Sequence, residues 1–334
     1  MKALSIDAPL FNQTPAQGIS HPLPVIASDG NVYFLKNYKI DNSDDFDAMF
    51  FQEALSVQLA QKLNIPVPDW AIIKIDVQTL NDFPELQFQY KFEPNEYYYA
   101  TKKVDNVAND LVTLLNEEVM LRTRGASQKL HNIFKKISNK NDIPSILLLD
   151  YWTSNVDRFT NSGNLILRVN KSGNYLIAID FGHCFFGPYW DKNTQSNFRE
   201  IINTADNGNI RQMSANLTSF YLRLAKVHAQ NNWKLGIVFD LLQKQISFNG
   251  MNPFDETMSR INNIDSNQII AMMNKIPASW IVRGDEQKSL YLQYLNAQKI
   301  ILPDLIQYQA EQELFTNFNG GTLEWRKEKN ISTQ

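Results

Sequence analysis

The side chains best suited to chemistry gather around one segment in the middle of the chain. Two apolar runs, residues 165–169 and 175–179, are joined by Asn-Lys-Ser-Gly-Asn, a combination typical of a β-hairpin. Asp157 and Asn164 precede the first run, and Asp180 follows the second. Because the strands of a hairpin pair with each other, we expect Asn164 and Asp180 to meet at its open end. Two carboxylates and an amide oxygen in one place are the base and metal ligands that Mg²⁺-dependent phosphoryl transfer requires.

A second pair of candidate residues lies far upstream. Lys36 ends an apolar strand of residues 32–36, and Glu53 lies in the middle of an apolar helix of residues 45–63. Taken singly, a lysine at a strand end and a glutamate in a helix are ordinarily solvated. A buried charge requires an opposite charge beside it, and these two residues could satisfy each other.

Together these residues match the parts of a protein-kinase-like phosphotransferase. In that scheme Lys36 would contact the α- and β-phosphates of ATP, and Glu53 would hold the lysine in place. Asp157 would accept the proton of the substrate hydroxyl or orient that hydroxyl. Asn164 and Asp180 would bind Mg²⁺ between the phosphates. The metal and the lysine would neutralise the charge that develops on the transferred group.

The elements that must position these residues divide the chain near residue 104. Residues 1–104 are expected to form a small, mostly antiparallel sheet with one helix, and residues 105–334 a larger, mostly helical lobe. The predicted class is therefore α+β, in a two-lobed protein-kinase-like fold with the hairpin in the larger lobe. The predicted strands of the small lobe are residues 24–27, 32–36, 70–75, 87–90 and 97–101.

Helical periodicity recurs through the larger lobe. Pro303 is expected to separate the last two helices, because proline has no N–H to donate within a helix. Residues 193–216 are polar, and their pattern favours neither helix nor loop. The predicted helices are residues 109–121, 128–137, 144–153, 217–231, 235–245, 266–275, 285–301 and 304–315.

Composition narrows the class of protein. The net charge of -3 is unlike that of a basic nucleic-acid-binding domain, so no direct nucleic-acid binding is expected. The single cysteine, Cys184, excludes an internal disulfide and a multi-cysteine zinc site. The N-terminus lacks the apolar core of a signal peptide, and no apolar run is long enough to cross a membrane. We therefore expect a soluble cytoplasmic protein that does not bind membranes.

Several segments resemble the HipA-like kinases, bacterial relatives of the HipA toxin kinase that are distantly similar to the phosphoinositide kinases. The most specific are Asn-Val-Asp-Arg at residues 155–158, Asn-Ser-Gly-Asn-Leu at residues 161–165 and Ile-Asp-Phe-Gly at residues 179–182. The resemblance spans about residues 18–305, with weaker agreement at residues 18–36, 51–68 and 276–280.

The resemblance implies an ATP- and Mg²⁺-dependent enzyme that phosphorylates Ser or Thr on a protein, with its own chain as one candidate. It leaves open an antitoxin or a DNA-binding protein as partner. His21 is a candidate contact to phosphate, and Ala100 and Lys102 lie in the segment expected to be the hinge that meets adenine. Two other interpretations stay open: a kinase of small hydroxylated molecules or lipid headgroups, and a pseudokinase that only binds nucleotide or protein.

One spacing departs from that of protein kinases, which place the metal-binding Asn five residues after the catalytic Asp. Ser162 occupies that position here. Asn164 lies two residues further on and directly precedes the strand, which favours it as the ligand, and Asn161 is the alternative. Arg158 is expected to pair with a carboxylate or with the backbone of the same loop.

Overall fold

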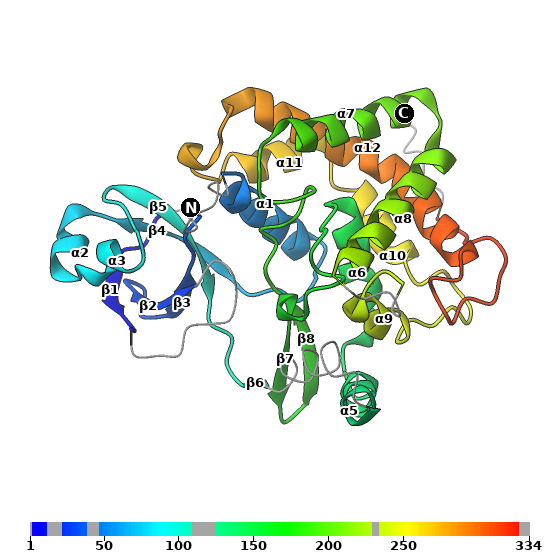
Figure 1. The fold of residues 1–334 in the computed structure, drawn as a ribbon, viewed down its shortest axis with the longest axis horizontal. Helices are drawn as coiled ribbons and strands as arrows, with labels where there is room; N and C mark the ends of the chain where they lie inside the picture. Colours follow the sequence, from blue (N-terminus) through cyan, green and yellow to red (C-terminus); the bar gives the residue numbers. More distant parts are fainter. Residues whose placement is uncertain (1, 12–21, 39–46, 109–123, 229–233, 327–334) are drawn as a thin grey trace, which may run out of the picture.

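The computed structural model describes residues 2–11, 22–38, 47–108, 124–228 and 234–326. Its N-terminal part is a five-stranded antiparallel sheet in the order β1-β2-β3-β5-β4 (Figure 1). The strands are β1 (Ile6–Pro9), β2 (Leu23–Ala27), β3 (Val32–Leu35), β4 (Trp70–Ile75) and β5 (Glu96–Lys102). Together with the helices that follow, this sheet confirms the predicted α+β class.

One predicted strand of this lobe is wrong. Residues 87–90 do not extend the sheet, because the chain between β4 and β5 forms two short helices, α2 (Val77–Asp82) and α3 (Glu85–Phe88). Asp76 caps α2 by accepting a hydrogen bond from the Thr79 N–H at 2.8 Å. Pro84 precedes α3, where its missing N–H costs nothing. These favourable helix N-termini outweigh the weak strand propensity of residues 87–90.

Helix α1 (Met49–Lys62) lies between the sheet and the helices of the larger lobe (Figure 1). It begins later than predicted because the residues before it bond elsewhere. The N–H of Ala48 donates to Pro188 O at 3.0 Å, and Asp47 Oδ1 accepts from the Trp190 N–H at 2.8 Å. Every residue of α1 from Met49 to Ala60 is buried, so the helix is enclosed on all sides.

Four hydrogen bonds join α1 and its C-terminal end to the larger lobe. Within α1, Gln52 Nε2 donates to Tyr291 Oη at 2.8 Å, and Gln58 Nε2 donates to Met272 O at 3.1 Å. Beyond the helix end, Arg260 Nη1 donates to Leu63 O at 3.0 Å. At the helix start, the Ala48 bond to residue 188 completes the set. The helix is therefore attached to the larger lobe along its whole length.

The predicted hairpin is confirmed. Strands β7 (Leu165–Asn170) and β8 (Gly173–Ala178) pair antiparallel, with Leu165 opposite Ala178. Asn170 Oδ1 accepts from the N–H groups of Ser172 and Gly173 and so fixes the turn. A short strand, β6 (Val107–Ala108), adds a third member to this sheet. The chain that leaves β5 therefore pairs with the hairpin within a few residues of the predicted lobe boundary.

The larger lobe is mostly helical, as predicted. Its described helices are α5 (Arg124–Lys135), α6 (Ile143–Trp152), α7 (Lys192–Asn207), α8 (Ile210–Val227), α9 (Ile237–Gln243), α10 (Asp255–Asn262), α11 (Ser266–Met273) and α12 (Gly284–Glu311). The ambiguous residues 193–216 thus lie in two helices, which Gly208 separates in a left-handed conformation (φ 75°). The predicted helix at residues 109–121 lies outside the described residues.

The predicted break at Pro303 is wrong, because α12 continues through it. Proline in a helix interior costs about 3 kcal/mol. The residues on both sides of it, Leu302 and Leu305 among them, are fully buried against neighbouring helices. Each buried Leu or Ile contributes about 1.5–3 kcal/mol, so packing on both sides outweighs the lost hydrogen bond.

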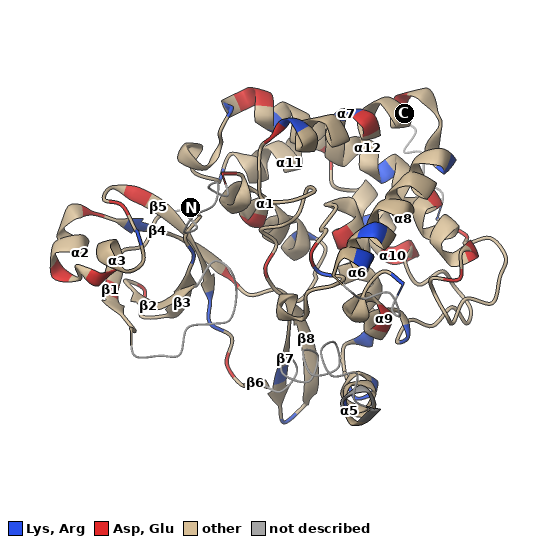
Figure 2. Cartoon of the chain, viewed as in Figure 1, with Lys and Arg blue, Asp and Glu red and all other residues tan. Residues whose placement is uncertain are grey.

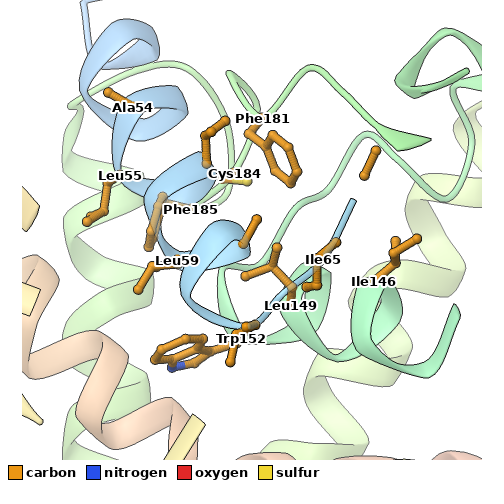
Figure 3. Close-up of a cluster of buried hydrophobic side chains, with 14 of the residues drawn as sticks. Ala54, Leu55, Leu59, Ile65, Ile146, Leu149, Trp152, Phe181, Cys184 and Phe185 are labelled. Atoms are coloured by element: carbon orange, nitrogen blue, oxygen red, sulfur yellow. The ribbon is translucent and has the colours of Figure 1, made fainter. Parts of the chain in front are cut away.

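The core joins the elements that carry the chemistry. Figure 3 shows side chains of α1, such as Leu55 and Leu59, packed beside Leu149 and Trp152 of α6 and beside Phe181 and Phe185 (Figure 3). Since Phe181 directly follows Asp180, this shared core fixes the end of the hairpin against α1. Among the described helices, none combines the length and apolar character needed to cross a membrane.

Candidate functional site

The structure brings together three charged residues that are far apart in sequence. Lys36 Nζ lies 2.7 Å from Glu53 Oε1, 2.9 Å from Glu53 Oε2 and 3.0 Å from Asp180 Oδ1. Lys36 follows β3, Glu53 lies in α1 and Asp180 follows β8. The expected pairing of Lys36 with Glu53 is thus present, and Asp180 joins it from the hairpin.

One ammonium group is shared by two carboxylates, and this sets their pKa values. Burial raises the pKa of Glu53 to about 7, although Lys36 acts against it. Burial also opposes the charge of Lys36, but the carboxylates of Asp180 and Glu53 outweigh that effect and raise the pKa of Lys36. For Asp180, the attraction of Lys36 outweighs burial and lowers the pKa. Lys36 and Asp180 are therefore charged at neutral pH, and Glu53 is close to its titration point.

The backbone around Asp180 is held in an unusual conformation. Asp180 has φ 57°, the left-handed region that costs a non-glycine residue about 1 kcal/mol. The next glycine packs tightly on α1, since a Cβ on Gly182 would lie 2.7 Å from Met49 Cγ. The Phe181 N–H also stabilises the Glu53 carboxylate. Backbone strain and close packing together aim the Asp180 carboxylate, whose side chain is 36% exposed, at Lys36.

The loop before the hairpin places two amides on one carboxylate oxygen. Asn161 Nδ2 and Asn164 Nδ2 donate to Asp157 Oδ2 at 2.9 and 2.8 Å. The Oδ1 atom of Asn161 already accepts from the Gly163 N–H at 2.9 Å. The two amides therefore differ: Asn161 caps a short 3-10 helix, whereas the amide oxygen of the buried Asn164 accepts no hydrogen bond from the described residues.

A buried ion pair packs against this loop and restrains its backbone. Arg158 Nε donates to Asp150 Oδ1 at 2.9 Å, and both side chains are fully buried. Arg158 Nη1 donates to the backbone oxygens of Asn164 and Ile179, the latter at 2.9 Å. The prediction that Arg158 pairs with a carboxylate or the loop backbone is confirmed on both counts. Arg158 thus connects the two metal-ligand candidates, since Ile179 directly precedes Asp180.

Asp150 is the residue of this site that sequence reasoning missed. It lies near the end of α6, and its remaining polar neighbour is Asn155, whose Nδ2 donates to Asp150 Oδ1 at 3.0 Å. Burial raises the pKa of Asp150, against the attraction of Arg158. A signal was present, because a single carboxylate follows the run Ile-Leu-Leu-Leu in a helix that is buried on every side.

The predicted adenine contacts lie in the sheet. Ala100 is buried in β5 between Leu35 of β3 and Ala71 of β4. The Lys102 N–H donates to Asp69 O at 2.8 Å, so it is already paired. Thr101 lies opposite Phe34, and strand alternation puts these two on the same face as Lys36. Both roles remain predictions, and His21 lies outside the described residues.

Two side chains could supply oxygen ligands to a metal. They are Asp180, through its carboxylate, and Asn164, through the amide oxygen that faces away from its bond to Asp157. Among the described residues, no cluster of three or more His, Cys, Asp or Glu side chains could hold a metal. One carboxylate and one amide fit Mg²⁺, which takes few protein ligands and completes its shell with phosphate oxygens and water.

Comparison with known proteins assigns the chain to a family. The family model for the HipA-like kinases matches residues 11–234. The chain belongs to the HipA-like kinase family. The match covers both halves of the candidate site, from Lys36 to Asp180, and the protein is a kinase. No curated protein matches this HipA-like kinase at a significant level.

A solved structure agrees on the fold. The Helicobacter pylori proinflammatory kinase CtkA superposes with a TM-score of 0.55 at 14% identity, over 93% of this chain and 99% of that one. At such low identity the likeness concerns the fold alone. It confirms the predicted kinase-like fold of this HipA-like kinase.

Proposed function

We propose that this HipA-like kinase transfers the γ-phosphoryl group of ATP, with Mg²⁺, to the hydroxyl of Ser or Thr on a protein. The observation that carries the proposal is the Lys36 ammonium held between Glu53 and Asp180, at 2.7 and 3.0 Å. A lysine fixed in this way presents a positive charge beside a metal-ligand candidate, as phosphoryl transfer from a nucleotide requires.

Each residue then has a part in holding the reactants. Lys36 would bind the non-transferred phosphates while Glu53 keeps its ammonium in position. Asn164 and Asp180 would hold Mg²⁺, which when bound neutralises charge on the phosphates. Because the pKa of Asp180 is lowered, its carboxylate is ionised and ready for a cation at neutral pH.

Asp157 is suited to act on the acceptor hydroxyl. Its Oδ2 atom takes both amide donors, from Asn161 and Asn164, which fixes the plane of the carboxylate. No bond to the other oxygen, Oδ1, is found among the described residues, so Oδ1 can accept the hydroxyl proton as that hydroxyl attacks phosphorus. The buried Asp150–Arg158 pair restrains the loop through the hydrogen bonds of Arg158 to its backbone.

The acceptor class is the part of the proposal that rests on the resemblance of the sequence motifs to the HipA-like kinases. The proposed acceptor is a Ser or Thr hydroxyl of a protein, and phosphorylation of this chain by itself is part of the proposal. The first test is therefore incubation of the full chain with γ-labelled ATP and Mg²⁺, with and without a protein mixture.

Asp157→Asn should reduce labelling at least about 100-fold, because it removes the base and keeps the shape. Asp82→Asn removes an exposed carboxylate of α2 and should leave labelling unchanged. Nucleotide binding without any turnover would identify a binding module instead. Transfer to sugars or lipid headgroups and to no protein would show that the acceptor class is wrong.

A further inference from the structure

Among the described residues, a hollow in the larger lobe is lined by three lysines and by no Asp or Glu. It has a volume of ≈ 770 Å³, and no residue of the candidate active site lines it. Its walls are α5, the segment that follows α9 and the segment that follows α12. We call it the basic pocket, because Lys135, Lys140 and Lys244 are among its lining residues, together with the imidazole of His131.

Two of these lysines have no counter-charge in the part of the chain that the structure describes. Among the described residues, neither Lys135 nor Lys140 forms an ion pair, whereas Lys244 lies 2.6 Å from Asp240. His131 Nε2 lies 3.5 Å from Lys244 Nζ. Helix α5 contains no Asp or Glu at all, although the chain as a whole is acidic (Figure 2). Within the described residues, the ammonium groups of Lys135 and Lys140 are therefore available to an anionic ligand.

The floor of the basic pocket is fixed by hydrogen bonds. Asn317 Nδ2 donates to Lys244 O and Ile246 O at 3.0 and 2.9 Å. The N–H and hydroxyl of Thr316 both donate to Gln243 Oε1. These bonds hold the segments after α9 and α12 together, so the hollow exists before any ligand arrives.

We propose that the basic pocket binds a phosphate monoester. Lysine ammonium groups carry three donors each, and a phosphate monoester offers nearly two negative charges and three acceptor oxygens to meet them. The hollow falls within the ~300–1,000 Å³ range of ligand sites, and Asn132 and Asn249 add neutral donors to its wall. The phosphate could be carried by a phosphorylated side chain of a protein or by a free small molecule.

The test uses the full chain without nucleotide. The probes are a fluorescent phosphoserine peptide and its unphosphorylated twin, with pyrophosphate and citrate as competitors. Lys135→Ala/Lys140→Ala removes the two unpaired lysines of the pocket. Lys129→Ala/Lys136→Ala removes the same charge from exposed positions of the same segment outside the pocket. The two variants therefore separate a built site from general attraction.

We expect the pocket variant to weaken phosphate binding about tenfold or more, and the control variant less than about twofold. Preference for the phosphopeptide over its twin would point to a protein source. Binding of pyrophosphate in calorimetry, without binding of the phosphopeptide, would point to a small molecule. The proposal is overturned if both variants weaken binding equally, if citrate competes as well as pyrophosphate, or if no probe binds at concentrations on the order of 10 mM. Unchanged binding in the pocket variant would place the phosphate elsewhere. None of these outcomes depends on phosphoryl transfer.

Discussion

The shared ammonium of Lys36 makes a sharp prediction for Glu53. Glu53→Gln keeps the shape of the side chain and removes its ability to ionise. In the native chain the pKa of Glu53 is about 7, against an ordinary value of 4.5. At pH values between these two pKa values, Glu53 holds a proton in the native state and has released it in the unfolded state. The native free energy of unfolding therefore falls as pH rises through this window.

The size of the effect follows from the two pKa values. They differ by about 2.5, and each pKa unit corresponds to 1.36 kcal/mol, so the full change is about 3 kcal/mol. Lys36 remains charged throughout, because its pKa is raised. Glu53→Gln cannot titrate, so the wild-type protein should lose about 3 kcal/mol relative to this variant between pH 4.5 and pH 8.

The assay is urea unfolding of both proteins at half-unit steps across that range, with Glu85→Gln as a control at an exposed site of α3. The difference between wild type and Glu53→Gln should decline with pH and level off above about pH 7. A difference that stays flat, or that grows with pH, would refute the reasoning. It would mean that Lys36 keeps Glu53 ionised in spite of burial.

Three further predictions concern the loop and the hairpin. Asn164→Ala should reduce the rate of phosphoryl transfer at least about tenfold more than Asn161→Ala, as measured with γ-labelled ATP. The reverse ranking would show that Asn161, and not Asn164, is the metal ligand. Gly182→Ala should lower activity because its Cβ would lie 2.7 Å from Met49 Cγ, and Met49→Ala in the same chain should restore it. Arg158→Met should cost about 3–5 kcal/mol in urea unfolding, since it leaves a buried carboxylate unpaired, and a loss below about 1 kcal/mol would contradict that role.

Part of the site could be predicted because Asn164 and Asp180 flank the two strands of the hairpin. The apolar runs of β7 and β8 and the turn between them determine the pairing, and pairing alone brings Asn164 and Asp180 together. The partnership of Lys36 with Glu53 could be expected because neither charge can be buried alone. Its extension to Asp180 could not, because that contact depends on how the hairpin packs against α1.

Other features depend on tertiary contacts that have no local pattern. One exception has a local cause: residues 87–90 alternate like a strand, but Pro84 is the N-cap residue of α3, which includes Gln87 and Phe88. Pro303 has the local signature of a helix end, and only burial on both sides of it keeps α12 continuous. The start of α1 was misplaced because the Ala48 N–H bonds to residue 188, far along the chain. At Pro303 and at the start of α1, the deciding partner is remote in sequence.

The attachment of α1 to the larger lobe has a consequence for how the enzyme could be controlled. Its bonds to Tyr291, Met272 and Pro188 mean that the helix cannot swing outward without exposing buried polar groups. The position of Glu53 is therefore fixed relative to the larger lobe, whereas the position of Lys36 depends on the sheet. A regulatory mechanism that moves Glu53 away from Lys36 would have to break the hydrogen bonds of α1 to the larger lobe, which costs free energy. A change in the distance between Lys36 and Glu53 would therefore have to come from the sheet that precedes Lys36.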